Sequence, residues 1–244
     1  MIKISNLTKK FDRFLAVDNL SLQIEKGEIF GFIGPNGAGK TTTIKMLTGV
    51  LMPTSGTIEI GGYDLEKDPV KAKQLIGYIP DDPYVYPELT GREFLYLVGR
   101  LFEVKNLEEK IKKLLLVYKL EKTVDGPFKD YSRGNKQKLT ILAAFLHQPE
   151  ILIIDEPMIG LDPLSVQITI DLFKEFARKK GSIFVSTHTL DIAEKICDRI
   201  GVIDQGRLIF EGTIRQLEKI VKKKGQHLEE LFLKLTAVNS KQDA

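Results

Sequence analysis

Short segments in which apolar residues dominate or alternate with polar ones recur between turns in the first third of the chain. This pattern is typical of β-strands, and the segments are 2–4, 20–24, 29–33, 57–60 and 75–80. Glu25-Lys26-Gly27-Glu28 is a plausible hairpin turn between the second and third segments. Phe11 and Phe14 are expected in the early loop. These strands predict a small β-rich layer around the loop that follows residue 33.

The pattern changes at about Asp82, where prolines and glycine mark a loop and helical spacing then takes over. One helix is indicated by Phe94, Leu95, Leu97, Val98 and Leu101. A second is indicated by Ile111, Leu114, Leu115 and Tyr118. We therefore predict that residues 88–147 form a helical subdomain inserted into an α/β core.

Strands and helices alternate again in the second half of the chain. The apolar run 151–154 ends in Asp155-Glu156, helix 164–179 follows, and the strand 182–186 ends at His188. Segments 200–204 and 207–210 suggest a final hairpin. Such alternation predicts a mostly parallel sheet, whose ligands bind at the carboxyl ends of the strands.

The strongest chemical signal is GPNGAGKT at 34–41, which fits G-x-x-x-x-G-K-[ST] without a mismatch. It lies between the strand 29–33 and a helix with Ile44, Met46, Leu47 and Val50 as its apolar positions. Glycines let backbone N–H groups approach phosphate oxygens, and a helix N-terminus favours an anion. The sequence thus predicts a nucleotide-binding protein with the binding residues Gly34, Pro35, Asn36, Gly37, Ala38, Gly39, Lys40, Thr41 and Thr42.

Composition narrows the class of protein only slightly. The 244 residues are 43% hydrophobic and 28% charged, which is ordinary for a soluble globular protein. A formal net charge of +3 does not suggest nucleic-acid binding, and Cys197 alone cannot form an internal disulfide. No stretch has the apolar length of a signal peptide core or of a membrane span. A role at a membrane would therefore need another subunit to supply the membrane part.

Four further motifs follow the phosphate loop, namely YSRGNKQ at 131–137, DEP at 155–157, GLD at 160–162 and STH at 186–188. With them, residues 2–215 resemble the nucleotide-binding subunit of ATP-binding-cassette (ABC) transporters. The resemblance implies a P-loop NTPase core with a mostly parallel sheet, an antiparallel β subdomain and an inserted helical subdomain. The ABC ATPase domain would span 1–215, and a helical tail 216–244. The resemblance also implies a head-to-tail dimer, in which each ATP lies between the phosphate loop of one subunit and the signature, 131–137, of the other.

The resemblance assigns the catalytic and metal-binding roles by motif position. Lys40 would contact the β- and γ-phosphates, and Thr41 and Asp155 would hold Mg²⁺. Glu156 would polarise the attacking water, and His188 would hydrogen-bond the γ-phosphate. His147 and His227 carry no such context and are expected to be structural.

The nucleotide's remaining contacts follow in the same way. Ser132 and Gly134 would contact the phosphate bound to the partner subunit, since they open the helix predicted at 136–147. Phe11 falls where an aromatic stacks on the adenine, although core packing or a role for Phe14 instead is open.

Two departures from the family pattern stand out. Asp81 follows Gly77-Tyr78-Ile79-Pro80 where the family usually has Gln. A carboxylate is also a hard ligand for Mg²⁺, but it adds negative charge near the γ-phosphate. The signature differs from Leu-Ser-Gly-Gly-Gln at Tyr131, Arg133 and Asn135. Arg133 could touch phosphate or face solvent.

The finer resemblance is to exporter-type ATPases that pair with separate membrane subunits. The expected function is ATP hydrolysis that powers export through an integral membrane permease, as a homodimer or with a paired ATPase subunit. The chain would then lie peripherally on the cytoplasmic face of the cell membrane. The loop 81–92 would dock the permease, and Tyr84 and Tyr86 suit such a contact or packing onto the helical subdomain.

The main alternative is a soluble ABC ATPase that acts on ribosomes, DNA or Fe–S assembly. A single phosphate loop and a separation of only about 90 residues between loop and signature argue against the ribosomal and DNA-repair members. A GTPase is disfavoured because 135–138, NKQK, lacks the Asp that reads guanine. In the tail, the basic residues could face anionic lipid or solvent, and a short amphipathic helix is expected at Leu228, Leu231, Phe232 and Leu235.

Overall fold

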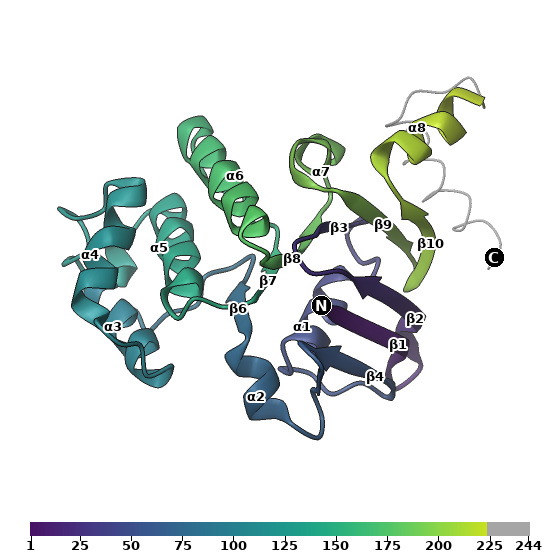
Figure 1. The fold of residues 1–244 in the computed structure, drawn as a ribbon, viewed down its shortest axis with the longest axis horizontal. Coiled ribbons are helices and arrows are strands. Elements are labelled where there is room, and N and C mark those ends of the chain that lie inside the picture. Colours follow the sequence, from purple (N-terminus) through teal and green to yellow (C-terminus); the bar gives the residue numbers. More distant parts are fainter. Residues whose placement is uncertain (224–244) are drawn as a thin grey trace.

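The larger of two β-sheets forms the centre of the computed structural model, which describes residues 1–223 (Figure 1). Its strand order is β10-β9-β3-β8-β7-β6. All neighbours pair in parallel except β9 and β10, which form an antiparallel hairpin. The strands are β3 (Ile29–Ile33), β6 (Ile76–Ile79), β7 (Ile151–Asp155), β8 (Ser182–Thr187), β9 (Arg199–Asp204) and β10 (Arg207–Gly212). The predicted mostly parallel sheet is confirmed.

A smaller antiparallel sheet lies beside it, with the order β2-β1-β4-β5. Its strands are β1 (Ile2–Phe11), β2 (Phe14–Ile24), β4 (Ser55–Ile60) and β5 (Tyr63–Asp64). The predicted hairpin at 25–28 is wrong, because β2 and β3 belong to different sheets. The chain crosses between the sheets here, and the Glu28 carboxylate fixes the crossing by accepting from the Glu25 N–H at 2.7 Å and pairing with Arg199 at 2.8 Å.

The early loop is also shorter than predicted. Phe11 is the last residue of β1 and Phe14 is the first residue of β2. The two are paired directly across from each other, so that only Asp12 and Arg13 form the turn. The hairpin continues beyond the apolar segments because backbone hydrogen bonds extend the ladder even where side chains such as Lys10 are exposed.

The helices are α1 (Lys40–Leu47), α2 (Pro69–Gln74), α3 (Gly91–Leu101), α4 (Leu107–Tyr118), α5 (Arg133–Leu146), α6 (Pro163–Arg178), α7 (Leu190–Ile196) and α8 (Ile214–Lys223). Helices α3, α4 and α5 gather at one end of the molecule, within the predicted range 88–147 (Figure 1). Helix α1 stops before the predicted position Val50, because Gly49 takes a φ of +64° and its N–H bonds to the Met46 carbonyl. Within residues 1–223, none of the helices has the length and apolarity needed to cross a membrane.

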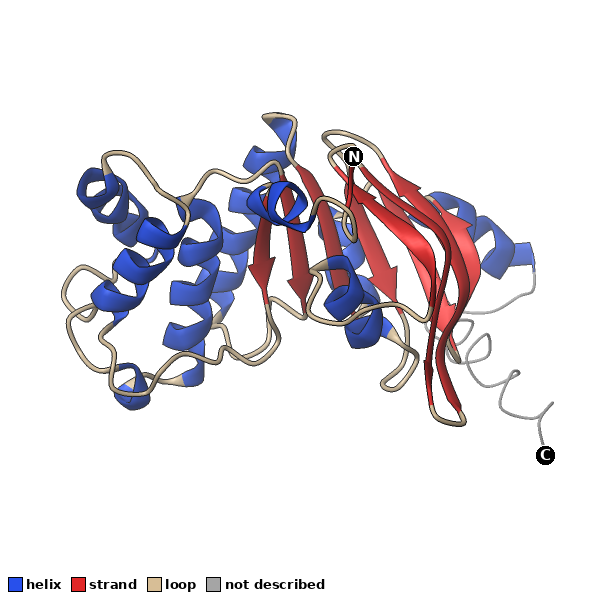
Figure 2. Ribbon diagram, turned by 90° about the horizontal axis from the view of Figure 1, so that it is seen from below, coloured by secondary structure: helices blue, strands red, loops and turns tan. Residues whose placement is uncertain are grey.

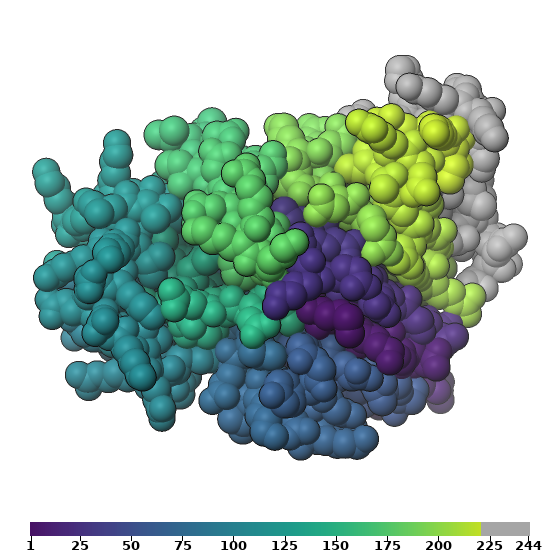
Figure 3. Space-filling view, viewed as in Figure 1, coloured from purple at the N-terminus to yellow at the C-terminus, as the bar shows by residue number. Residues whose placement is uncertain are grey.

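Alternating residues of the central strands point into two apolar clusters. Phe30 of β3, Ile153 of β7 and Phe184 of β8 pack with α1 and the small sheet. Their neighbours along the same strands, such as Leu152 and Ile183, pack with α5 and α6 on the other face. Because both faces of β7 and β8 are covered, these strands are buried along their whole length, as the apolar run 151–154 predicts. Figure 2 shows the strands between the flanking helices, and Figure 3 shows the helical end as a separate lobe.

The predicted amphipathic helix at 228–235, the structural role expected for His227 and the basic residue Lys224 of the tail lie outside the described part of the chain. The last described helix, α8, buries Leu217 against a small cluster formed with α7 and β9.

Candidate nucleotide site

The loop 34–39 connects β3 to α1 in a conformation that requires glycine at two positions. Gly39 has a φ of +107°, and a Cβ atom there would lie 2.5 Å from the Ala16 carbonyl oxygen. A Cβ atom on Gly34 would lie 2.3 Å from the Ile203 carbonyl oxygen. Both distances are well below van der Waals contact, so only glycine fits at these two positions, and the loop closes tightly at the carboxyl edge of β3.

A hollow of about 280 Å³ lies over this loop. It gathers most of the predicted site from three separate parts of the chain, and its lining residues are Phe14, Ala16, Asn36, Gly37, Gly39, Lys40, Thr41, Thr42, Asp81, Asp155 and Glu156. The predicted convergence of the phosphate loop with Asp155-Glu156 is thus observed, whereas His188, which was expected at the same place, does not line the hollow and contacts Glu156 instead. Gly34, Pro35 and Ala38 belong to the loop itself but do not line the hollow.

Lys40 is the first residue of α1 and is almost fully buried. Its Nζ donates to the carbonyl oxygens of Gly34 at 2.6 Å and Pro35 at 3.1 Å, which ties the ammonium to its own loop. Burial lowers the pKa of Lys40, and the nearby carboxylates of Glu156 and Asp155 oppose this shift. The ammonium is therefore held at the wall of the hollow, where an incoming phosphate would provide stronger acceptors than two carbonyls.

Asp155 ends β7 and is buried, and its Oδ1 accepts a hydrogen bond from the Ser186 hydroxyl of the neighbouring strand β8. The next residue, Glu156, has a φ of +46°, which is unusual for a residue with a side chain and is found where surrounding structure enforces it. Its Oε1 lies 2.9 Å from Nδ1 of His188, just after β8. Burial raises the pKa of Glu156, and His188 and then Lys40 counteract the rise.

The contact between Glu156 and His188 predicts a pH dependence for the expected hydrolysis of ATP. If the Glu156 carboxylate is the active form, the acid limb of kcat/KM lies above the ordinary value of about 4.5, because the pKa is raised. His188→Ala removes the largest influence that lowers this pKa, so the limb moves to higher pH whatever happens to the maximal rate. A pH profile of kcat/KM for wild type and variant checks this, and the matched control is His147→Ala. An acid limb that moves to lower pH, or stays in place, would contradict it.

The two aromatic residues expected to stack on the adenine, Phe11 and Phe14, lie together at the end of the β1–β2 hairpin. Phe14 is 63% exposed and lines the hollow, whereas Phe11 is 44% exposed, does not line it, and has the Lys9 ammonium 5.1 Å from its ring centroid. Neither ring is packed in the core.

The signature lies outside this hollow, at the N-terminus of α5. Ser132 caps the helix by accepting from the Asn135 N–H at 3.3 Å, and the helix begins at Arg133, earlier than the predicted residue 136. A Cβ atom on Gly134 would lie 2.5 Å from the Gly160 carbonyl oxygen, so the signature packs closely on the segment 160–162. Ser132 and Gly134 do not line their own subunit's hollow.

Five contacts that the sequence did not predict tie these motifs together. The Ser186 hydroxyl orients Asp155, and the Gln137 amide donates to the Pro157 carbonyl at 3.4 Å. Lys138 pairs with Asp162 at 2.9 Å, while Asp162 caps α6 through the Ser165 N–H. Asp81 pairs with Arg133 at 3.4 Å. Of these contacts, the one between Ser186 and Asp155 could have been predicted. Both residues end predicted parallel strands, and adjacent strands bring such residues side by side.

The docking candidates Tyr84 and Tyr86 are 89% and 68% exposed. Packing onto the helical subdomain is therefore wrong for both rings. Their loop joins β6 to α3, and Val85 between them packs into the apolar cluster, which leaves the two phenol rings on the surface.

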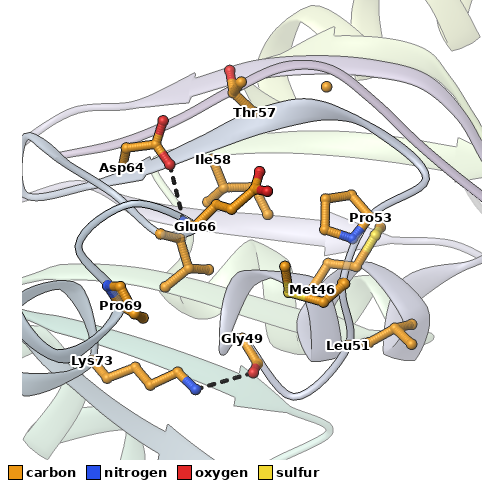
Figure 4. Close-up of a pocket in the computed structure, with 13 residues that line it drawn as sticks. Met46, Gly49, Leu51, Pro53, Thr57, Ile58, Asp64, Glu66, Pro69 and Lys73 are labelled. Atoms are coloured by element: carbon orange, nitrogen blue, oxygen red, sulfur yellow. Dashed lines mark hydrogen bonds between the residues drawn. The ribbon is translucent and has the colours of Figure 1, made fainter.

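A second, smaller hollow of about 150 Å³ lies beyond the C-terminus of α1 (Figure 4). Its lining is mainly apolar, with Met46, Leu51, Pro53 and Ile58 among its residues. The polar groups there are engaged locally, since Lys73 donates to the Gly49 carbonyl at 3.0 Å and the Glu66 N–H to Asp64 at 2.9 Å. It holds none of the predicted site residues.

The site combines a phosphate loop with an Asp-Glu pair at the end of a strand and a histidine in contact with the glutamate. Together these features define a P-loop nucleotide-binding ATPase. The chain belongs to the ABC transporter family, whose model matches residues 17–159, and it is an ABC ATPase. It is 37% identical over 215 residues to the linearmycin resistance ATP-binding protein LnrL of Bacillus subtilis, covering 87% of this chain and 69% of that one. It is 35% identical to the Nod factor export ATP-binding protein I of Cupriavidus metallidurans, covering 89% and 72%.

A solved structure described as the ATP-binding subunit of an ABC transporter superposes on the chain with a TM-score of 0.90. The two are 34% identical, and the match covers 97% of this chain and 99% of the other. The expected fold class and family are thereby confirmed, and a soluble ABC ATPase acting on a non-membrane partner is not favoured.

Proposed function

We propose that this chain is the ATP-hydrolysing motor subunit of a membrane exporter, acting with a separate permease as a head-to-tail ATPase dimer. The observation that carries the proposal is the geometry of a half-site. The hollow supplies a phosphate loop, a metal-ligand set and a general base, whereas Ser132 and Gly134 of the signature lie outside it, at the start of α5. A second subunit would bring its Ser132 and Gly134 over the bound nucleotide and complete the site. The names of the relatives, which include resistance and export proteins, support the exporter role.

The residues in the hollow fit a Mg²⁺–ATP complex. Thr41, Asp81 and Asp155 all line this hollow and carry hydroxyl and carboxylate oxygens, which are the ligands that Mg²⁺ prefers. Mg²⁺ usually takes one or two carboxylates and completes its shell with water and phosphate, so a small protein ligand set is sufficient. When bound, it would neutralise charge on the β- and γ-phosphates.

The remaining roles follow from the contacts of the chain's own residues. The loop N–H groups and Lys40 bind the phosphates, and Lys40 exchanges two carbonyl acceptors for phosphate oxygens. Glu156 accepts a proton from the attacking water, and His188, in contact with Glu156, keeps the water and the γ-phosphate aligned. The aromatic end of the β1–β2 hairpin stacks on the adenine, with Phe14 at the edge of the hollow and Phe11 directly across from it. Closure of the dimer on ATP and its reopening after hydrolysis would drive the permease.

The test of the exporter role is capture of the tagged chain from detergent-solubilised membranes, followed by identification of stoichiometric partners by mass spectrometry. We expect a polytopic membrane protein at equal stoichiometry. Replacing Tyr84 and Tyr86 together by serine should reduce its recovery severalfold, because exposed aromatic rings commonly anchor such interfaces. Replacing the exposed Tyr63, on the small sheet, is the matched control. Recovery with ribosomes or only soluble proteins would contradict the proposal.

A further inference from the structure

Two positions at which the chain departs from its family's pattern contact each other in the structure. Asp81 stands where the family usually has Gln, and Arg133 stands at a glycine position of the signature. Nη2 of Arg133 lies 3.4 Å from Oδ1 of Asp81. Two neutral residues of the pattern are thus replaced by opposite charges that form an ion pair, which gives each departure a physical reason.

The pair joins two functional regions of one subunit. Asp81 follows β6 and lines the nucleotide hollow together with Thr41 and Asp155. Arg133 is the first residue of α5 and lies between Ser132 and Gly134, the residues proposed to contact the partner's nucleotide. A movement of Asp81 in response to its own nucleotide would therefore act directly on the segment that reaches the other one.

The junction around this pair is open. Arg133, Lys136, Asp82 and Pro83 line a hollow of about 490 Å³ between the loop after β6 and the start of α5. Other contacts from the start of α5 go to the segment after β7, through Gly160, Pro157 and Asp162, and the Lys136 ammonium lies 5.4 Å from the Phe128 ring centroid. The ion pair lies at the edge of this open hollow, which Arg133 lines, and it connects the start of α5 to the loop after β6.

We propose that the Asp81–Arg133 ion pair is a latch that holds the signature toward its own subunit's hollow and opens when Asp81 turns to the bound Mg²⁺–nucleotide. Opening frees the guanidinium beside Ser132 and Gly134, where it can meet the partner's phosphate. The side chains are 56% and 46% exposed, so the pair is weak and readily exchanged. This latch rests on the proposed function, because it presumes that the hollow binds nucleotide.

A distance measurement tests the latch without relying on activity. Spin labels are placed at Val70→Cys on α2 and Leu116→Cys on α4, since both native side chains are exposed, in a chain whose native Cys197 is replaced by alanine so that it takes no label. Distance distributions between the labels are recorded for the nucleotide-free chain with the wild-type pair, with Asp81→Asn, with Arg133→Gln, and with the charge-reversed pair Asp81→Arg and Arg133→Asp. The matched control is Glu88→Gln, which breaks the exposed ion pair with Lys129.

We expect each single variant to shift or broaden the distribution, the reversed pair to restore it, and Glu88→Gln to leave it unchanged. Adding Mg²⁺–ATP, or salt at about 1 M, which screens exposed charges, should shift the wild-type distribution toward that of the single variants. Single variants indistinguishable from wild type would overturn the latch, as would a reversed pair that fails to restore the distribution. A wild-type distribution that nucleotide leaves unchanged would also overturn it.

The two proposals fail in different ways. Binding of a fluorescent ATP analogue is measured on the same samples, and its absence would overturn the nucleotide site and the trigger of the latch together. The nucleotide-free distributions do not depend on that binding, and by themselves they decide whether the pair holds the signature. Normal binding with unchanged distributions would overturn the latch alone.

Discussion

Replacing Glu156 by glutamine should lower ATP hydrolysis by about 100-fold or more, the range expected for loss of a general base. The amide keeps the size of the side chain and can still contact His188, but it cannot accept a proton from water. ATP binding should persist, because the phosphate loop and Lys40 are untouched. The unhydrolysed ATP should then hold two subunits together, which light scattering would detect as an ATP-dependent doubling of mass.

The matched control for this variant is Glu150→Gln, at the other end of the same strand. Glu150 directly precedes β7, and its carboxylate lies 4.0 Å from the Lys26 ammonium and does not line the nucleotide hollow, so its replacement should leave hydrolysis unchanged. Wild-type turnover by the Glu156 variant would remove Glu156 from the role of base.

Replacing Lys40 by alanine should weaken ATP binding by about 10- to 100-fold, since a charged hydrogen bond contributes about 1.5–3 kcal/mol. The variant should fold normally, because the Lys40 ammonium donates its hydrogen bonds to carbonyls of the loop and burial already disfavours its charged form. Titration with a fluorescent ATP analogue measures the loss. Lys45→Ala, at an exposed position on the same helix, is the control, and equal affinities for the two variants would contradict the role of Lys40.

The predictions from the sequence are correct where the local pattern of residues is enough to determine the structure of a segment. Residues 151–154 are apolar without a break because both sheet faces are covered, so the strand and the carboxylates that follow it could be predicted directly. The phosphate loop could be recognised because its motif is contiguous in the sequence, although two of its glycines are required by contacts with the distant carbonyls of Ala16 and Ile203.

The errors arose where the pairing of distant segments decides the outcome. Nothing in 25–28 shows that the strands on either side enter different sheets, because that choice depends on β1, β8 and β9. The extension of the β1–β2 hairpin to Phe11 and Phe14 depends on register, which apolar spacing near polar lysines does not fix. The ion pair of Asp81 with Arg133 joins residues 52 positions apart, and each departure alone gave no reason to expect the other.

The central claim is that each ATP is held by two subunits, and complementation tests it most directly. Lys40→Ala spoils a phosphate loop, and Gly134→Ala spoils a signature, because its Cβ would meet the Gly160 carbonyl at 2.5 Å. Each variant alone should hydrolyse little ATP, with circular dichroism used to show that both are folded. Co-expressed with different tags and mixed at random, they should recover up to about a quarter of wild-type activity, since half the dimers are mixed and each has one intact site. Activity no higher than that of the separate variants would contradict a shared site.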